Sequence, residues 1–267
     1  MLYLTQKVKV QYVLGFDNEI IPEKEERPMG KLCKDQRETL IGKLAALFTG
    51  VTADEIDEVV DATKTRLTSE AKEAKNRERL ETFDGQVKTL IDKGYPEAAG
   101  MEKDQFLGYV NPLRDKFEIG DIIVIPERIV SISKQMSLVK LNGKTGYTYL
   151  NLGALTQADG VETPNVPYLI RDVENGAAMR NTSPDNSVKQ FKKQGRFGLV
   201  TEEGIAIVTH KPETLNDHCI DLPGSRFDSG FVPFLWLVGG RPGLDCIWAG
   251  YAFSRWGSAS CGSRIRA

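Results

Sequence analysis

The spacing of hydrophobic residues changes along the chain, and the change predicts helices first and strands later. In the N-terminal part apolar positions recur at helical intervals, as at Leu40, Leu44 and Leu47. From about residue 116 onward, short apolar runs alternate with turns rich in asparagine and glycine, a pattern typical of strands joined by tight connections. We therefore expect an α+β protein, with a helical N-terminal region and a mixed α/β C-terminal domain whose strands are largely antiparallel.

The same pattern divides the chain into three parts. Residues 1–30 contain an alternating stretch at 8–13, which predicts a strand, followed by an acidic linker with prolines. Residues 31–115 are expected to form a helical region. Residues 116–267 are expected to form an α+β domain whose end is rich in glycine, serine, arginine and tryptophan.

A long, charged helix is predicted to begin at a capping box. Thr52 and Glu55 have the spacing at which a hydroxyl and a carboxylate satisfy each other's free backbone donors. Beyond Leu67 the apolar stripe thins to alanines among lysine, glutamate and arginine. Such a face is either solvated or recruits a partner, so residues 52–81 are a candidate protein-interaction helix. Shorter helices are predicted at 86–93 and 102–110.

Two Asn-Gly pairs predict hairpins, because type I′ turns require positive φ at both central positions. The pair at 142–143 would join strands 136–141 and 145–150, and the pair at 175–176 would join strands 168–173 and 177–181. Further strands are expected at 121–126, 231–238 and 245–253. Helices are expected from the Ser183-Pro184 start to Gly195, and at 201–210, where acids occupy the first turn.

Charge and composition narrow the classes of function. The 35 basic and 37 acidic residues nearly cancel, to a net charge of −2, which leaves no basic field for nucleic acid. The longest apolar run, 231–238, is too short to cross a bilayer, and no signal-peptide apolar block stands at the start. Four cysteines without a C-x-x-C pair are typical of a reducing compartment. We expect a cytoplasmic protein that binds neither nucleic acid nor membrane.

Candidate chemistry gathers in residues 223–267. This segment holds all three tryptophans, two of the four cysteines and no lysine, so that every basic residue in it is arginine. Two Gly-Ser-Arg triplets, at 224–226 and 262–264, each offer a backbone N–H, a hydroxyl and a guanidinium. Those are the donors that a carboxylate or phosphate needs.

Our preferred hypothesis is a small anionic ligand bound at this end of the chain. Arg226 and Arg264 would clamp the anion, and Trp256 would form a wall of the pocket. Hydrogen bonds would come from Ser225, Ser260 and Ser263. The alternative interpretation pairs the arginines with nearby aspartates and uses the glycines for tight turns.

A thiol-dependent enzyme is a second hypothesis. Cys261 lies where backbone N–H groups could stabilise an oxyanion, with His210 or His218 as its base. Three cysteines and a histidine could also bind zinc, but among them only His218 and Cys219 are close in sequence. As direct neighbours on a strand they would point to opposite faces. We assign no metal site and no cofactor.

Several phrases of the sequence resemble a known family. They lie at 90–96, 99–101, 201–213, 222–226 and 256–264, and the last, Trp-Gly-Ser-Ala-Ser-Cys-Gly-Ser-Arg, is the most specific. Over about residues 86–267 the chain resembles a bacterial family known only as a domain of unknown function. The resemblance implies a single bacterial cytoplasmic domain. It assigns no chemistry to any residue.

Overall fold

The structure is a computed structural model that describes residues 53–228 and 230–267. The helix expected around Leu44, the strand expected at 8–13 and the capping residue Thr52 lie outside the described residues. The chain divides into two compact units, Met1–Ala71 and Lys72–Ala267. The second unit contains every site discussed below.

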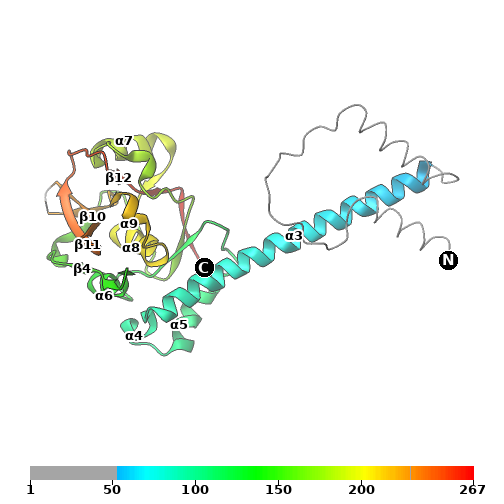
Figure 1. The fold of residues 1–267 in the computed structure, drawn as a ribbon, viewed down its shortest axis with the longest axis horizontal. Coiled ribbons are helices and arrows are strands. Elements are labelled where there is room, and N and C mark those ends of the chain that lie inside the picture. Colours follow the sequence, from blue (N-terminus) through cyan, green and yellow to red (C-terminus); the bar gives the residue numbers. More distant parts are fainter. Residues whose placement is uncertain (1–52, 229) are drawn as a thin grey trace. The chain divides into compact units, whose positions relative to one another are not determined.

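The helical part consists of α3 (Ala53–Asp92), α4 (Tyr95–Ala99), α5 (Lys103–Val110) and the 3-10 helix η1 (Asn111–Leu113). The helix expected at 86–93 is the end of α3, because the helix continues through Gly85 and buries Phe83 and Leu90. Gly94, at φ 87°, ends this run. In Figure 1, α4 and α5 lie beside the C-terminal part of α3.

Val60 and Leu67 of α3 are exposed in this structure. Partner binding through residues 52–81 stays a prediction.

A small sheet has both of its faces buried. Its strands are β1 (Ile122–Val124), β6 (Tyr168–Arg171) and β14 (Ser263–Arg266), which pair antiparallel in the order β1-β6-β14. Because side chains alternate along a strand, Ile122 and Ile170 face one hydrophobic cluster, whereas Ile123 and Leu169 face another. The second cluster also contains Phe83, Leu90, Tyr95, Phe106 and Val110 of the helices.

The larger sheet follows the order β12-β8-β10-β11-β4, with β5 and β9 beside that path. Its strands are β4 (Tyr147–Thr148), β5 (Leu155–Gln157), β8 (Cys219–Asp221), β9 (Ser225–Phe227), β10 (Phe231–Val238), β11 (Arg241–Trp248) and β12 (Trp256–Ser258). The pairs β12–β8 and β11–β4 are parallel and the others are antiparallel. The expected α+β class, with a helical N-terminal part and largely antiparallel strands, is confirmed.

The remaining elements connect these layers. They are α6 (Ile132–Leu138), β2 (Lys140–Leu141), β3 (Lys144–Thr145), η2 (Leu152–Ala154), η3 (Ala177–Met179), α7 (Pro184–Gln194), β7 (Phe197–Gly198), α8 (Thr201–His210), α9 (Thr214–Asp217) and β13 (Ser260–Cys261). The strands β7 and β13 pair with each other, as do β2 and β3.

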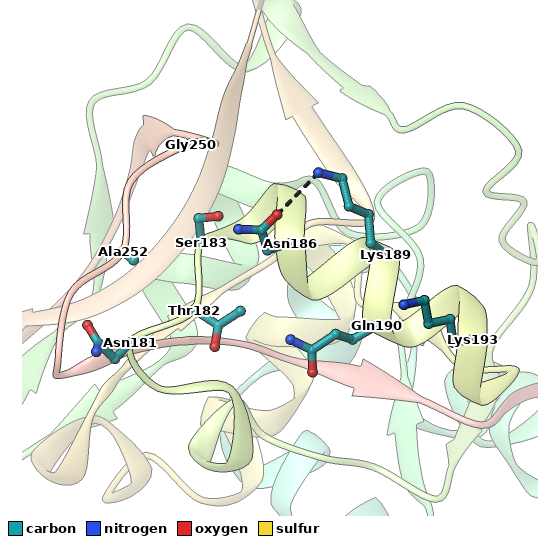
Figure 2. A pocket seen from close by; sticks show the side chains of 9 residues that line it. All are labelled: Asn181, Thr182, Ser183, Asn186, Lys189, Gln190, Lys193, Gly250 and Ala252. Atoms are coloured by element: carbon teal, nitrogen blue, oxygen red, sulfur yellow. Dashed lines mark hydrogen bonds between the residues drawn. The ribbon is translucent and has the colours of Figure 1, made fainter.

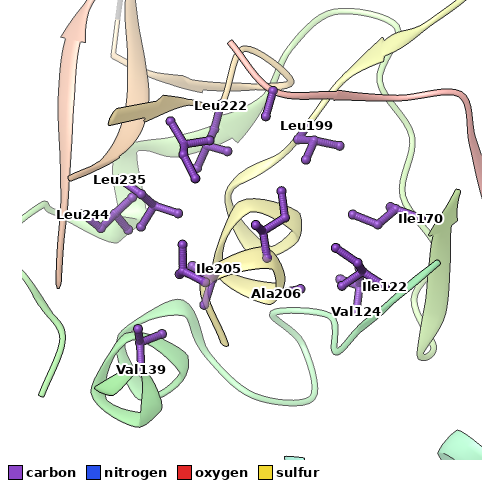
Figure 3. Packing of buried hydrophobic residues seen from close by; sticks show 14 of the residues in the cluster. Ile122, Val124, Val139, Ile170, Leu199, Ile205, Ala206, Leu222, Leu235 and Leu244 are labelled. Atoms are coloured by element: carbon purple, nitrogen blue, oxygen red, sulfur yellow. The ribbon is translucent and has the colours of Figure 1, made fainter. Parts of the chain in front are cut away.

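Helix α8 lies between the two sheets and is buried from Thr201 to Thr209. Figure 3 shows Ile205 and Ala206 of α8 with side chains from the larger sheet on one side and from the small sheet on the other. The larger sheet contributes Leu222, Leu235 and Leu244, and the small sheet contributes Ile122, Val124 and Ile170. A helix buried all round needs apolar residues on every face, and α8 has them after its first turn.

Two expected strands are wrong over part of their length, and in both cases a side chain forms hydrogen bonds with the backbone of nearby residues. Residues 136–138 belong to α6, where the buried Gln135 donates to the carbonyls of Ile125 and Val130 at 3.0 and 2.7 Å. The expected strand at 177–181 begins as η3, because the Glu174 carboxylate accepts the backbone N–H groups of Gly176 and Ala178.

The Asn-Gly turn at 142–143 is confirmed, with φ of 52° and 75°.

Within the part of the chain that the structure describes, none of the helices combines the length and the apolar composition that spanning a membrane requires.

Gly204 lies where α8 packs against Leu222, and a Cβ at this position would overlap the Leu222 methyl groups. We expect Gly204→Ala to destabilise the domain by about 1–3 kcal/mol, because the well-packed core must shift to admit a methyl group. Urea unfolding monitored by circular dichroism measures the change.

Gly85→Ala is the matched control, because a Cβ there meets nothing within 4 Å in α3. Removing a helical glycine in open space should stabilise by about 0.5–1 kcal/mol. Equal effects of the two substitutions would contradict the packing described for α8.

Candidate functional site

The register of the small sheet directs Arg264 toward α8. Arg264 stands opposite Ile170 across β14 and β6, so both side chains lie on the face that packs against α8. Its Nε donates to Oε1 of Glu203 at 2.5 Å, and its Nη2 donates to Oε2 at 2.8 Å. The Glu203 side chain is 0% exposed and that of Arg264 is 9% exposed. The two residues form a buried bidentate ion pair.

Further hydrogen bonds complete the surroundings of this ion pair. The Glu203 carboxylate accepts the backbone N–H of Val200 at 2.9 Å and the hydroxyl of Tyr168 at 3.0 Å. Arg264 also donates to the carbonyl of Gly198 at 3.1 Å. Burial first, and then the neighbouring carboxylates, hold the pKa of Tyr168 well above its usual value, so its hydroxyl remains a donor. The guanidinium of Arg264 thus binds groups of the protein itself.

Arg226 also binds its own protein. It lies on β9, and its Nη1 donates to the carbonyls of Pro223 and Ser225 at 2.6 and 2.9 Å. Neither Arg226 nor Arg264 lines the cleft beside α7 or the cavity at the start of α8. The anion clamp formed by these two arginines stays a prediction, and their contacts do not favour it.

The other predicted ligand-binding residues are placed separately. The buried Ser260 hydroxyl accepts the Nε of Arg196 at 2.9 Å. Ser263 stands opposite Arg171 in the small sheet. The ring of Trp256 packs on Phe234, with centroids 4.2 Å apart. Each of these three residues contributes to packing or strand pairing in the structure.

The predicted catalytic residues Cys261 and His210 lie in unfavourable surroundings for thiol chemistry. Cys261 is 0% exposed, and burial, followed by the charge of Glu203, raises the pKa of its thiol to about 12. Burial lowers the pKa of His210 to about 4. An activated thiol needs a lowered pKa, so the shift at Cys261 is opposite to the one required. Among the described cysteines, Cys219, Cys246 and Cys261 are all free.

Asp221 is a buried acid on the larger sheet. It stands between Phe234 of β10 and Ser258 of β12 and is 2% exposed. Among the described residues, its Oδ1 has no hydrogen-bond partner, and neither has the Ser258 hydroxyl. Burial raises the pKa of Asp221 to about 7. A buried carboxyl without a counter-charge favours its protonated form.

A cleft with a volume of about 530 Å³ lies beside α7. Four polar side chains of α7 line it from one helical face, because they are spaced by three and four residues. They are Asn186, Lys189, Gln190 and Lys193. The preceding segment contributes Asn181, Thr182 and Ser183, and the opposite wall contains Gly250 and Ala252. Figure 2 shows these side chains around the cleft.

The cleft beside α7, hereafter the α7 cleft, is locally basic. The ammonium group of Lys189 donates to the Asn186 side chain at 3.2 Å. Within the described part of the chain, neither Lys189 nor Lys193 forms an ion pair with a carboxylate. No aspartate or glutamate stands among the residues that line the cleft. Two positive charges therefore remain available to a ligand.

A family model described as a family of unknown function (DUF5701) matches residues 89–267. The chain belongs to this family. No curated protein and no solved structure matches it.

The DUF5701 match contains the buried ion pair, Asp221 and every residue that lines the α7 cleft. It begins inside α3, close to the first residues of that helix that belong to the core. The candidate sites are therefore parts of the DUF5701 domain itself.

Sequence reasoning missed the α7 cleft and the partner of Arg264. The spacing of Lys189 and Lys193 is visible in the sequence, but it is also the spacing of an ordinary solvated helix face. Glu203 stands in the first turn of a predicted helix, where acids are expected for the helix dipole. Neither signal reveals which residues the fold places opposite.

The contacts of the two triplet arginines predict very different effects of replacing them. Arg264→Met leaves the carboxylate of Glu203 buried without its counter-charge, which should cost about 3–5 kcal/mol of unfolding free energy. Arg226→Met removes two hydrogen bonds from a half-buried side chain and should cost about 1 kcal/mol. Urea unfolding at pH 7 measures both. Similar losses in the two variants would show that the ion pair is not the stronger constraint.

Asp221 predicts a pH-dependent stability. Because its pKa rises from 3.8 to about 7 on folding, the group contributes stability below pH 3.8 that is lost as the pH rises toward 7. Asp221→Asn removes this loss, so the variant should gain on the order of 2–4 kcal/mol over the wild type between pH 4 and pH 8. Thermal unfolding across this range measures the difference.

The control for Asp221 is Asp245→Asn, which changes an exposed carboxylate on the neighbouring part of the sheet. This variant should keep the loss of stability that the wild type shows as the pH rises toward 7. A constant difference between Asp221→Asn and the wild type across this pH range would mean that Asp221 is ionised in the fold.

Proposed function

We propose that this domain binds a small anionic ligand in the α7 cleft. The observation that carries the proposal is the pair Lys189 and Lys193 beside a cavity of about 530 Å³ that no carboxylate lines. Small-molecule sites in proteins are typically about 300–1,000 Å³, so the size suits a metabolite with one or two phosphate or carboxylate groups.

The donors around the cleft suit an anion with several oxygen atoms. The lysines supply charge, and the amides of Asn181, Asn186 and Gln190 supply neutral donors. Charge-assisted hydrogen bonds are about twice as strong as neutral ones, so the ammonium groups would dominate affinity and the amides would select shape.

Backbone hydrogen bonds hold the two walls of the cleft together. The N–H of Asp185, in the first turn of α7, donates to the carbonyl of Ala249 at 3.1 Å. The N–H of Asn181 is within 3.1 Å of the carbonyls of Phe253 and Trp256. Because these backbone bonds join the walls directly, the walls need no ligand to bring them together, which favours affinity.

The proposed ligand is a small anion, as in the hypothesis based on the two Gly-Ser-Arg triplets. The proposed binding site is a different one. One wall of the α7 cleft, Gly250 and Ala252, belongs to the glycine-rich segment 223–267. The positive charges come from α7 instead, because Arg264 is engaged by Glu203. The cleft is therefore the better-supported place for the anion.

Replacing both lysines tests the proposal. We expect Lys189→Ala/Lys193→Ala to weaken binding of inorganic phosphate or citrate by about tenfold or more, since each lysine supplies a charge-assisted contact. Nuclear magnetic resonance titration of ¹⁵N-labelled protein measures affinity and location together. Binding should also weaken at high ionic strength, because the lysines are exposed.

Lys192→Ala is the matched control, since Lys192 lies on α7 but does not line the cleft. It should leave affinity nearly unchanged. Chemical-shift changes centred on Arg226 and Arg264 would place the anion away from α7 and overturn the proposal. An equal loss of affinity in Lys192→Ala and in the double variant would also overturn it.

A further inference from the structure

A second, smaller cavity lies at the N-terminal end of α8. Its volume is about 80 Å³, comparable to two or three water molecules at about 30 Å³ each. Its polar lining comes from the loop after β1, from the start of α8, and from the paired strands β5 and β9. These residues are Glu127, Thr156, Gln157, Thr201, Glu202 and Ser225. None of them lines the α7 cleft, so the two sites are independent.

The Glu202 carboxyl group is held in one orientation. Its Oε2 accepts the backbone N–H of Glu127 at 2.7 Å, and its Oε1 lies 3.3 Å from the Tyr168 hydroxyl, whose single hydrogen is shared with the nearer Oε1 of Glu203. The residue is 8% exposed. Each carboxylate oxygen can accept two hydrogen bonds, so each oxygen keeps capacity for a ligand in the cavity.

Glu202 lacks the counter-charge that its neighbour has. Glu203 is neutralised by Arg264. Within the described ranges, no lysine, arginine or histidine forms an ion pair with Glu202 or Glu127. A buried carboxylate is costly unless a cation or a proton compensates it. The cavity therefore combines the buried acid Glu202 and the exposed acid Glu127, and no cationic side chain lines it.

An independent observation comes from two hydroxyl groups in the same cavity. Ser225 is 3% exposed and Thr201 is 2% exposed. The Ser225 oxygen accepts the backbone N–H of Thr201 at 2.9 Å and the hydroxyl of Thr201 at 3.0 Å. The hydroxyl hydrogen of Ser225 itself has no acceptor among the described residues and is available to a ligand.

We propose that this cavity, the Glu202 pocket, binds a small primary amine that carries an oxygen acceptor close to its ammonium group, of the size of ethanolamine. The ammonium group supplies the missing positive charge and donates to the free capacity of the Glu202 and Glu127 carboxylates. The oxygen of the ligand accepts the unused hydroxyl hydrogen of Ser225. A divalent metal fits less well, because the described residues contain no group of three or more His, Cys, Asp or Glu with a metal-binding arrangement.

Binding of a cation at this position is linked to the proton on Glu202. Burial, and then the charges of Glu203 and Glu127, raise the pKa of Glu202 to about 7, whereas the bonds from Glu127 and Tyr168 oppose the rise. Burial also raises the pKa of Glu127. The charge of Glu203 is compensated by its ion pair with Arg264. The ammonium group favours the ionised carboxylate, so affinity should rise with pH up to about 7 and level above it.

Titration of the full chain with ethanolamine hydrochloride tests the proposal. At pH 8 we expect saturable chemical-shift changes at the amides of Glu127 and Thr201. Ethylammonium, which lacks the oxygen, should bind several-fold more weakly, and tetramethylammonium, which lacks N–H donors, should not bind. The affinity for ethanolamine should fall about tenfold for each pH unit below 7.

Variants give a second measurement. Glu202→Gln keeps the shape of the side chain and should weaken ethanolamine binding by about tenfold or more. Glu162→Gln, at an exposed position outside the pocket, is the matched control and should leave affinity unchanged. The comparison of ethanolamine, ethylammonium and tetramethylammonium uses the wild type alone. It therefore tests the proposal even if Glu202→Gln folds poorly.

Three results would overturn the proposal. Equal shifts with tetramethylammonium or sodium chloride would show a general effect of ionic strength. Binding that does not change between pH 5 and pH 8 would remove Glu202 as the partner of the ligand. The absence of saturable shifts with any amine would leave the pocket as a site for water alone. The phosphate titration of the α7 cleft is unaffected by each of these outcomes.

Discussion

The ion pair between Glu203 and Arg264 is the constraint on which the arrangement of this domain depends. It joins the first turn of α8 to the last strand of the small sheet, and its hydrogen bonds reach Tyr168 on β6 and the backbone at 198–200. Burying either charge alone is costly, so these elements are stable only together. Glu202 lies in the same first turn of α8, so the ion pair of Glu203 also fixes the position of the Glu202 carboxyl group in its pocket.

The two candidate sites have opposite electrostatic character. The α7 cleft has two lysines and no carboxylate, whereas the Glu202 pocket has two carboxylates and no cation among its lining residues. The whole chain is nearly neutral, with a net charge of −2. A balanced total therefore conceals local concentrations of charge of either sign. Arguments from net charge exclude extended polyelectrolyte surfaces but say little about individual cavities.

Local sequence signals predicted the elements whose residues agree with their surroundings. Helix α7 follows from Ser183-Pro184 and Gly195, α8 from the acids in its first turn, and β10 from its apolar run. The strand predicted at Met136 is wrong, because its helix includes contacts of the buried Gln135 with the loop that precedes α6. The site could be located only in part: the segment 223–267 was singled out, but Arg264 meets Glu203 across 61 residues. That meeting is set by strand register, which no local pattern in this chain reveals.

The small sheet has a hydrophobic cluster on each face, and its middle strand supplies side chains to both. Ile170 packs toward α8, whereas the adjacent Leu169 packs toward the helices α3 to α5. Neither cluster can lose its order without exposing the backbone of the strand that the other cluster needs. The helical layer and the sheet layers are therefore one cooperative folding unit, in which backbone amides on either side of β6 exchange with solvent through the same global opening.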